Sequence, residues 1–296
     1  MATILVYGAT GPQGRAVTLS LLGRGHRVLC LVRDPTRASD LLGRGAEIRI
    51  GDLADRRSLA RASEGVDTVV SILPLSFNDG IMLSSGVNVI AAAEDAAVPF
   101  LIHNMGVCAP ERSVGYHFFD VLRRITDRVL GARIPTLVLR PPLYLDNLLA
   151  PWTLPHLEKH DVVSYPLPGE VAVPWLSHRN LGAYITAAVG RVDLTGRVLD
   201  ITDGTERSGE MIAEAMSRHL GRPVGYEAIP TDLFASRVAA LLGATAGSEL
   251  AEHYNLLTAN ECDLLRGVSN KGVRALQPEL EEIDEFVSRS FAATPH

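Results

Sequence analysis

The loop Gly8-Ala-Thr-Gly11-Pro-Gln-Gly14 decides the fold of this chain. It follows the short apolar run Thr3–Tyr7 and opens a helical segment, which is the context in which such a loop binds a dinucleotide. Gly8 is expected to permit the turn, Gly11 to let the backbone approach a pyrophosphate, and Gly14 to let helix and strand pack closely. A glycine turn without a ligand is the alternative. We expect the cofactor to contact Gly8, Thr10, Gly11, Pro12, Gln13 and Gly14.

Short apolar runs alternate with helical patterns through the first half of the chain. Runs that are apolar on both faces are typical of parallel strands with helices on each side. The expected strands are Thr3–Tyr7, Arg27–Val32, Ala46–Ile50, Asp67–Leu73, Pro99–His103 and Pro135–Leu139. Between them lie helical stripes, one of them behind the cap signal Asn78-Asp79. The alternation predicts an α/β fold of Rossmann type, a doubly wound parallel sheet built from right-handed βαβ units.

The pattern changes after Pro141-Pro142, where a proline-rich stretch extends to residue 178. Helical spacing then returns, for example from Ser208 to Leu220. We expect residues 1–150 to form the dinucleotide-binding domain and residues 151–296 to form a smaller, mostly helical substrate lobe. No low-complexity linker separates the two. The second lobe is therefore expected to be interleaved with the first and not independently folded.

The end of the second expected strand discriminates between cofactors. An NAD-specific site has an acidic residue about 20 residues past the loop, where it accepts a hydrogen bond from the ribose 2′-hydroxyl. This chain has Leu31-Val32-Arg33-Asp34-Pro35 there. A guanidinium at Arg33 is suited to bind a 2′-phosphate in bidentate geometry, with Arg37 placed to assist. The sequence therefore favours NADPH over NADH if Asp34 turns away from the site; a solvated surface arginine is the alternative.

Two more strand ends are expected to complete the cofactor site, because ligands of open parallel sheets bind at the carboxyl ends of the strands. Asp52 and Leu53 follow the third strand, and Leu73 closes the fourth. Asp52 is suited either to accept a hydrogen bond from the adenine amino group or to cap the following helix. The sequence leaves both interpretations open.

Composition restricts the function classes. The 296 residues are 47% hydrophobic and 21% charged, which is ordinary for a globular protein, and the net charge of −6 argues against a basic nucleic-acid surface. The three cysteines lie far apart, so neither a disulfide framework nor a metal site is expected. No apolar stretch approaches the roughly 18 residues of a membrane span, and the N-terminus lacks a signal-peptide pattern. We expect a cytoplasmic protein without membrane or nucleic-acid partners; its oligomeric state stays open.

With these pieces placed, the chain resembles the NmrA-like branch of the atypical short-chain dehydrogenase/reductases. The residues that carry the resemblance are the glycine loop, Val32-Arg33-Asp34-Pro35, Gly51-Asp52-Leu53, Leu139-Arg140-Pro141-Pro142 and Asp146-Asn147-Leu148. Members include quinone reductases, ketoreductases of aromatic polyketide (antibiotic) pathways and NADP sensors without catalytic activity. The resemblance implies that Pro141 and Pro142 lie against the nicotinamide.

The chain departs from that superfamily at its catalytic positions. Standard members have a serine after the fifth strand and a Tyr-x-x-x-Lys pair on the next helix, where the lysine lowers the tyrosine pKa so that the tyrosine protonates the carbonyl oxygen. Here the fifth strand ends in His103-Asn104-Met105-Gly106, and the helix reads Tyr116-His-Phe-Phe-Asp120. No lysine precedes Lys159. Hydride transfer does not require this pair, because the cofactor performs it once a carbonyl is held against its nicotinamide.

Tyr116 and Asn104 are the remaining catalytic candidates. Tyr116 and Asp120 are spaced i, i+4, which predicts a shared helix face that is either cleft or solvent. An ordinary half-buried tyrosine is the alternative for Tyr116. Asn104 is suited to donate to a carbonyl oxygen or, alternatively, to satisfy a loop backbone. His103 lies in an apolar strand and is expected to be a core histidine.

Two functions agree with these observations. One is an NADPH-dependent reductase of a ketone or quinone carbonyl, acting on a small aromatic substrate of polyketide type whose own phenolic hydroxyl supplies the proton. The other is a non-catalytic NADP-binding regulator. Trp152, Tyr165 and Trp175 favour the reductase if they line an apolar cleft, although packing in the core is the alternative.

Overall fold

The computed structural model describes residues 1–291, without the side chains of residues 260 and 261. The chain divides into two compact units. The first unit comprises residues 1–141, 178–201 and 269–279, and the second comprises residues 142–177, 202–268 and those from 280 onward. The first segment of the first unit ends at Pro141, and the predicted division of domains at residue 150 stays a prediction. The first unit also includes residues 178–201 and 269–279, because these supply a strand and two helices that pack in its layers.

Seven parallel strands form the sheet of the first unit in the order β10-β6-β5-β4-β1-β2-β3. The strands are β1 (Thr3–Tyr7), β2 (Arg27–Val32), β3 (Glu47–Ile50), β4 (Thr68–Ile72), β5 (Leu101–Asn104), β6 (Thr136–Arg140) and β10 (Arg197–Asp200). The predicted doubly wound sheet is confirmed. The strand order reverses between β1 and β4, and ligands of such sheets bind outside the carboxyl ends of the strands at this reversal.

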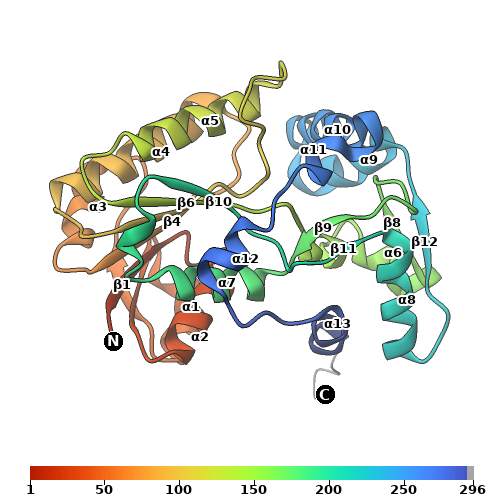
Figure 1. The fold of residues 1–296 in the computed structure, drawn as a ribbon, viewed down its shortest axis with the longest axis horizontal. Helices are drawn as coiled ribbons and strands as arrows, with labels where there is room; N and C mark the ends of the chain where they lie inside the picture. Colours follow the sequence, from red (N-terminus) through yellow and green to blue (C-terminus); the bar gives the residue numbers. More distant parts are fainter. Residues whose placement is uncertain (292–296) are drawn as a thin grey trace. The chain divides into compact units, whose positions relative to one another are not determined.

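Helices cover both faces of this sheet (Figure 1). On one face α3 (Arg56–Ser63), α4 (Asp79–Asp95) and α5 (His117–Leu130) lie side by side, and on the other α1 (Pro12–Gly23) packs against α7 (His178–Ala188). The shorter helices of the unit are the 3-10 helices η1 (Pro35–Ala38) and η3 (Val192–Leu194), α2 (Ser39–Leu42) and α12 (Lys271–Leu276). Both faces of the inner strands are therefore buried, which explains why these strands are apolar on both sides, whereas the edge strand β3 is exposed or half-buried.

The start and the packing of α4 follow from its sequence. The Asn78 side chain caps the helix by accepting a hydrogen bond from the Ile81 amide at 3.0 Å. Gly86 lies on the buried face, where a Cβ would stand 2.9 Å from the Ile125 side chain of α5. The two helices therefore approach each other closely at Gly86.

The second unit is mostly helical. Its helices are α6 (Leu154–His160), α8 (Gly209–Leu220), α9 (Thr231–Leu242), α10 (Ala244–Thr258), α11 (Asp263–Arg266) and α13 (Ile283–Phe291), with 3-10 helices η2 (Leu145–Leu149) and η4 (Ala259–Cys262). One small sheet joins β7 (Leu143–Tyr144), β9 (Val173–Leu176) and β11 (Glu206–Arg207), and another pairs β8 (Val162–Tyr165) with β12 (Gly225–Ala228). Over residues 1–291, neither unit contains a helix long and apolar enough to cross a membrane.

Candidate cofactor-binding site

The glycine loop lies at the carboxyl end of β1, beside the end of β4. Gly8 has a φ of +76°, and a Cβ there would stand 2.2 Å from the Ile72 carbonyl oxygen. At Gly14 a Cβ would stand 2.1 Å from the Gly8 carbonyl oxygen. The chain itself therefore requires glycine at both positions, one for the turn and one for the close approach of helix and loop.

Gly11 has a different role in the loop. Its φ of −80° and ψ of 165° are open to any residue, and in the described chain a Cβ there would contact only the Gly8 carbonyl oxygen, at 3.5 Å. The fold itself does not demand glycine at this position. The missing side chain instead leaves the backbone bare, which is what a pyrophosphate needs for close approach. This geometry fits a bound dinucleotide.

The first turn of α1 presents backbone amides to the same place. Gly11 is the N-cap, and Pro12 occupies the first helical position, where a helix does not need the N–H that proline lacks. The Arg15 amide donates to the Gly11 carbonyl at 2.9 Å, and this is the first hydrogen bond of the helix that spans four positions. The amides of Gln13 and Gly14 precede it and have no intrahelical acceptor, which favours an anion at this helix end.

The Gln13 side chain is held by the end of β5. Asn104 donates from Nδ2 to Gln13 Oε1 at 2.9 Å, and Asn104 Oδ1 accepts from the Gly106 amide at 3.4 Å. Asn104 is buried. It thus satisfies a loop backbone, one of its two expected roles, and a catalytic role for it stays a prediction.

Arg33 is exposed directly after β2, and no carboxylate in residues 1–291 pairs with it. The neighbouring Asp34 caps η1, where its Oδ1 accepts from the Thr36 amide at 3.0 Å and from Thr36 Oγ1 at 2.8 Å. These hydrogen bonds hold the pKa of Asp34 below its usual range. The condition that Asp34 is engaged elsewhere is met, while the 2′-phosphate contact of Arg33 stays a prediction.

Asp52 and Leu53 follow β3, and Leu73 follows β4; all three are half-buried. Asp52 Oδ1 accepts from the Ala54 amide at 3.0 Å within a turn, and the N-cap of α3 is Asp55. The interpretation of Asp52 as the helix cap is therefore wrong, because the helix begins three residues later than the spacing suggested. Its contact with adenine stays a prediction.

Pro141 and Pro142 are both buried after β6, with Pro141 in the first unit and Pro142 in the second. The residue before them, Arg140, donates from Nε to Asp200 Oδ1 at 2.5 Å. Asp200 Oδ2 in turn accepts from Ser269 Oγ at 2.6 Å. This ion pair fixes the end of β6 against β10 and so places Pro141 in its unit. A contact of the two prolines with the nicotinamide stays a prediction.

Tyr116 lies before α5 as its N-cap residue and is only 1% exposed. Its ring meets the Phe119 ring edge-on, with centroids 5.0 Å apart. The prediction that Tyr116 and Asp120 share a helix face is wrong, because the helix begins at His117 and the Tyr116 ring turns inward. Asp120 accepts instead from Ser113 Oγ at 2.9 Å. A catalytic role for Tyr116 stays a prediction.

His103 is the core histidine that its strand predicted. Its Nδ1 lies 3.1 Å from Ser71 Oγ on β4, and its buried Nε2 has no hydrogen-bond partner in the described chain. Burial lowers the pKa of His103 to about 4. The ring is therefore neutral near pH 7 and does not act as a general acid there.

Tyr165 and Trp175 pack inside the second unit and are at most 1% exposed. Trp175 Nε1 donates to the Arg207 carbonyl at 2.9 Å, and the Tyr165 hydroxyl bonds to that of Tyr254. The prediction that these two rings line an open cleft is wrong, because β8 and β9 direct them into the interior. Trp152 is half-buried.

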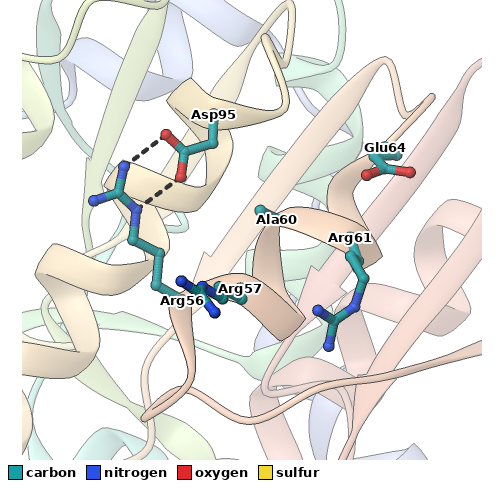
Figure 2. Close-up of a pocket in the computed structure, with 6 residues that line it drawn as sticks. All are labelled: Arg56, Arg57, Ala60, Arg61, Glu64 and Asp95. Carbon is teal, nitrogen blue, oxygen red and sulfur yellow. Dashed lines mark hydrogen bonds and ion pairs between the residues drawn. The ribbon is translucent and has the colours of Figure 1, made fainter.

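One hollow of about 420 Å³ lies on the first unit, over α3 and the end of α4 (Figure 2). Its lining residues are Arg56, Arg57, Ala60, Arg61, Glu64 and Asp95. Arg56 donates from Nε and Nη2 to the Asp95 carboxylate at 2.7 and 2.6 Å. None of the predicted cofactor residues lines this hollow, so it takes no part in the candidate site.

Arg15 is a residue of the site that the sequence analysis missed. Its Nε donates to the Thr10 carbonyl at 3.1 Å, and its Nη1 forms an ion pair with Asp40. The available signal was electrostatic: a cation in the first turn of a helix is disfavoured by the helix dipole, so its presence indicates a dedicated partner.

The NmrA-like family model matches residues 1–287 of the chain. The chain belongs to the NmrA-like family. The predicted resemblance is thereby confirmed. An NAD(P)H azoreductase of Xenophilus azovorans is 29% identical over 292 residues, which are 98% of each chain. A (4-alkanoyl-5-oxo-2,5-dihydrofuran-3-yl)methyl phosphate reductase of Streptomyces griseus is 30% identical over 232 residues, 77% of this chain and 78% of that protein.

A solved structure has a similar fold. The triphenylmethane reductase of Citrobacter sp., crystallised with NADP(H), superposes with a TM-score of 0.80 over 97% of this chain and 100% of that one. At 21% identity, this similarity shows that the two chains share a fold.

Proposed function

We propose that this protein is an NADPH-dependent reductase, acting on a ketone or quinone carbonyl of an aromatic, polyketide-type small molecule. At the general level it is an NAD(P)H-dependent oxidoreductase, in agreement with the relatives that are named as reductases. The observation that carries the choice of NADPH is the Arg33 guanidinium, exposed at the end of β2 and without a carboxylate partner in residues 1–291. Asp34, which would favour NADH, is engaged with Thr36.

The residues of the first unit divide the binding of this cofactor among them. The amides of Gln13 and Gly14 bind the pyrophosphate at the N-terminus of α1, where Gly11 admits it. Arg33 binds the 2′-phosphate through its two-pronged guanidinium. When bound, NADPH supplies the hydride. The chain contributes mainly positioning of the acceptor, which is a large part of the rate enhancement in such reactions.

The proton source is the distinctive part of this proposal. Hydrogen bonds from Ser113 and Arg123 hold the pKa of Asp120 below its usual range, so the residue at the lysine position stays ionised. His103 is neutral, and Tyr116 is buried among aromatic rings. A phenolic hydroxyl beside the substrate carbonyl is already hydrogen-bonded to it, so it both polarises the carbonyl and supplies the proton. Aromatic polyketides carry this arrangement.

A matched pair of acceptors tests the substrate and the proton source together. NADPH oxidation is followed with a polycyclic quinone or ketone that bears a hydroxyl beside the carbonyl, and with its O-methyl ether. We expect turnover of the hydroxylated acceptor and a rate at least about tenfold lower with the ether. Equal rates would show that the substrate hydroxyl is not the proton source. No oxidation with any quinone, ketone or azo acceptor, combined with tight NADP binding, would identify a regulator instead.

The variant Arg33→Ala tests the cofactor site. Losing charge-assisted hydrogen bonds to a phosphate is expected to weaken NADPH binding by about 10- to 100-fold and to leave NADH binding little changed. Arg44→Ala is the matched control, since it removes an exposed arginine from the same β2–β3 connection. An unchanged preference for NADPH in Arg33→Ala would refute the assignment.

A further inference from the structure

We infer that Arg15 and Asp40 form a latch that holds the 2′-phosphate-binding loop against the glycine loop, and that this latch sets the preference for NADPH. Arg15 is thus a positioning residue for specificity and not a ligand of the cofactor. The inference rests on the proposed contact of Arg33 with the 2′-phosphate, and it adds to it the device that keeps Arg33 in place.

The Arg15 guanidinium connects the glycine loop with the segment that follows β2. Nε donates to the Thr10 carbonyl of the glycine loop at 3.1 Å, and Nη2 donates to the Arg37 carbonyl of η1 at 2.9 Å. Nη1 forms an ion pair with Asp40 at the start of α2. Three of its five N–H donors are thereby used by protein acceptors, in a forked geometry that only arginine provides.

The segment held by Arg15 is short, and its residues 33–37 are exposed while Ala38 at its end is buried, so its exposed part gains from an external support. It runs from Arg33 through η1, and its internal bonds join Asp34 to Thr36 and to the Arg37 amide, the latter at 3.3 Å. These bonds shape the turn but tie it to no other element. The link to Thr10 comes through Arg15. Both arginines of the loop are exposed and long. A fixed backbone therefore lowers the conformational entropy that the loop loses when a 2′-phosphate binds.

Neutralising Asp40 distinguishes the latch from a simple charge effect, because the two explanations predict opposite changes in NADP binding. Asp40 is a negative charge in the same β2–β3 connection as Arg33 and Arg37, so its neutralisation would, by charge alone, strengthen NADP binding. If Asp40 acts by anchoring Arg15, its neutralisation instead releases the loop and weakens NADP binding relative to NAD.

The test measures the affinities of the full chain for NADP⁺ and NAD⁺, and for 2′,5′-ADP and 5′-AMP, in Arg15→Ala, Arg15→Lys and Asp40→Asn. We expect the NADP⁺/NAD⁺ affinity ratio to fall roughly tenfold in Arg15→Ala, nearly as far in Arg15→Lys, and about threefold in Asp40→Asn. The control is Arg27→Ala, at the start of β2, whereas Arg33 follows the end of that strand. This variant breaks a bidentate pair in which Arg27 donates two hydrogen bonds of 2.7 Å to Glu47. Its ratio should stay at the wild-type value.

The outcomes separate the latch from the cofactor site itself. A ratio that is unchanged or raised in Asp40→Asn, or unchanged in Arg15→Lys, overturns the latch. A loss of NAD⁺ and NADP⁺ affinity by the same factor in all three variants also overturns it, because a merely structural role affects both cofactors equally. If Arg33→Ala shifts the ratio and these variants do not, the cofactor site stands and the latch fails. If Arg33→Ala does not shift it, the proposed cofactor site fails.

Discussion

Asn104 donates a hydrogen bond from Nδ2 to Oε1 of Gln13, with 2.9 Å between the two atoms. The bond joins the last residue of β5 to the first turn of α1, 91 positions apart in the chain. In the superfamily pattern a catalytic serine follows the fifth strand, the strand that Asn104 ends here. The side-chain amide of Asn104 instead binds Gln13 and so orients the glycine loop. We therefore expect this side chain to act on cofactor binding more than on the chemical step.

The variant Asn104→Ala tests that expectation. Loss of one neutral hydrogen bond of about 1 kcal/mol should raise the KM for NADPH by roughly fivefold, while kcat falls about tenfold or less. Steady-state kinetics with NADPH varied measure both quantities. In the Asn104→Ala background, Gln13→Ala should add little, because the two residues act through one bond. A large drop in kcat at unchanged KM would instead assign Asn104 to the reacting carbonyl.

Two glycines of the loop should respond differently to alanine. Gly11→Ala places a methyl group in ordinary van der Waals contact with the Gly8 carbonyl oxygen, at 3.5 Å, so the free energy of unfolding should change by less than about 0.5 kcal/mol while NADPH binding weakens by an order of magnitude or more. Gly14→Ala drives a methyl group into the Gly8 carbonyl and should destabilise the chain by roughly 1–3 kcal/mol. Thermal unfolding and cofactor titration of both variants measure the contrast. Unimpaired NADPH binding by Gly11→Ala would contradict the proposed approach of the pyrophosphate.

Local patterns were sufficient to predict the glycine loop and six strands of the seven-stranded sheet, but not that β10 joins it. Gly8 and Gly14 are constrained by atoms within a few residues or on the adjacent strand, so spacing alone identified them. The Arg15 latch was not predicted because its acceptors come from residues 10, 37 and 40, which only the folded βαβ unit brings together. Spacing likewise predicted a helix that includes Tyr116, whereas the helix begins at His117 and the tyrosine before it is buried.

The buried pair of Arg140 and Asp200 should make stability depend on pH. Burial alone would raise the pKa of Asp200, but hydrogen bonds from Arg140 and Ser269 outweigh it and hold that pKa below its usual range. A carboxyl with a lowered folded-state pKa stabilises the fold above its unfolded value, about 3.9, and this contribution is lost as pH falls through the lower folded value.

Asp200→Asn removes that contribution and leaves Arg140 without its counter-charge. Since the two side chains are only 14% and 7% exposed, we expect the free energy of unfolding to fall by about 3–5 kcal/mol near pH 7. Urea denaturation from pH 3 to pH 8 should show the difference from wild type shrinking below about pH 4. Glu47→Gln, which breaks an exposed pair with Arg27, serves as the control and should have little effect. A difference that grows as pH falls would refute the assigned role of Asp200.

A proton completes carbonyl reduction, and Tyr116 is the residue at which its source can be tested. Tyr116 occupies the tyrosine of the superfamily pattern, but residue 120 is an ionised aspartate and no lysine precedes Lys159, so nothing in that pattern lowers the tyrosine pKa. If the substrate hydroxyl supplies the proton, Tyr116→Phe should lower kcat by about tenfold or less and leave NADPH affinity intact. Tyr226→Phe, a tyrosine of the second unit that donates to the Leu167 carbonyl at 2.9 Å, controls for the general effect of removing a hydrogen-bonded phenol. A kcat loss of about a thousandfold in Tyr116→Phe alone, with unchanged thermal stability, would show that Tyr116 is the acid and that the substrate is not.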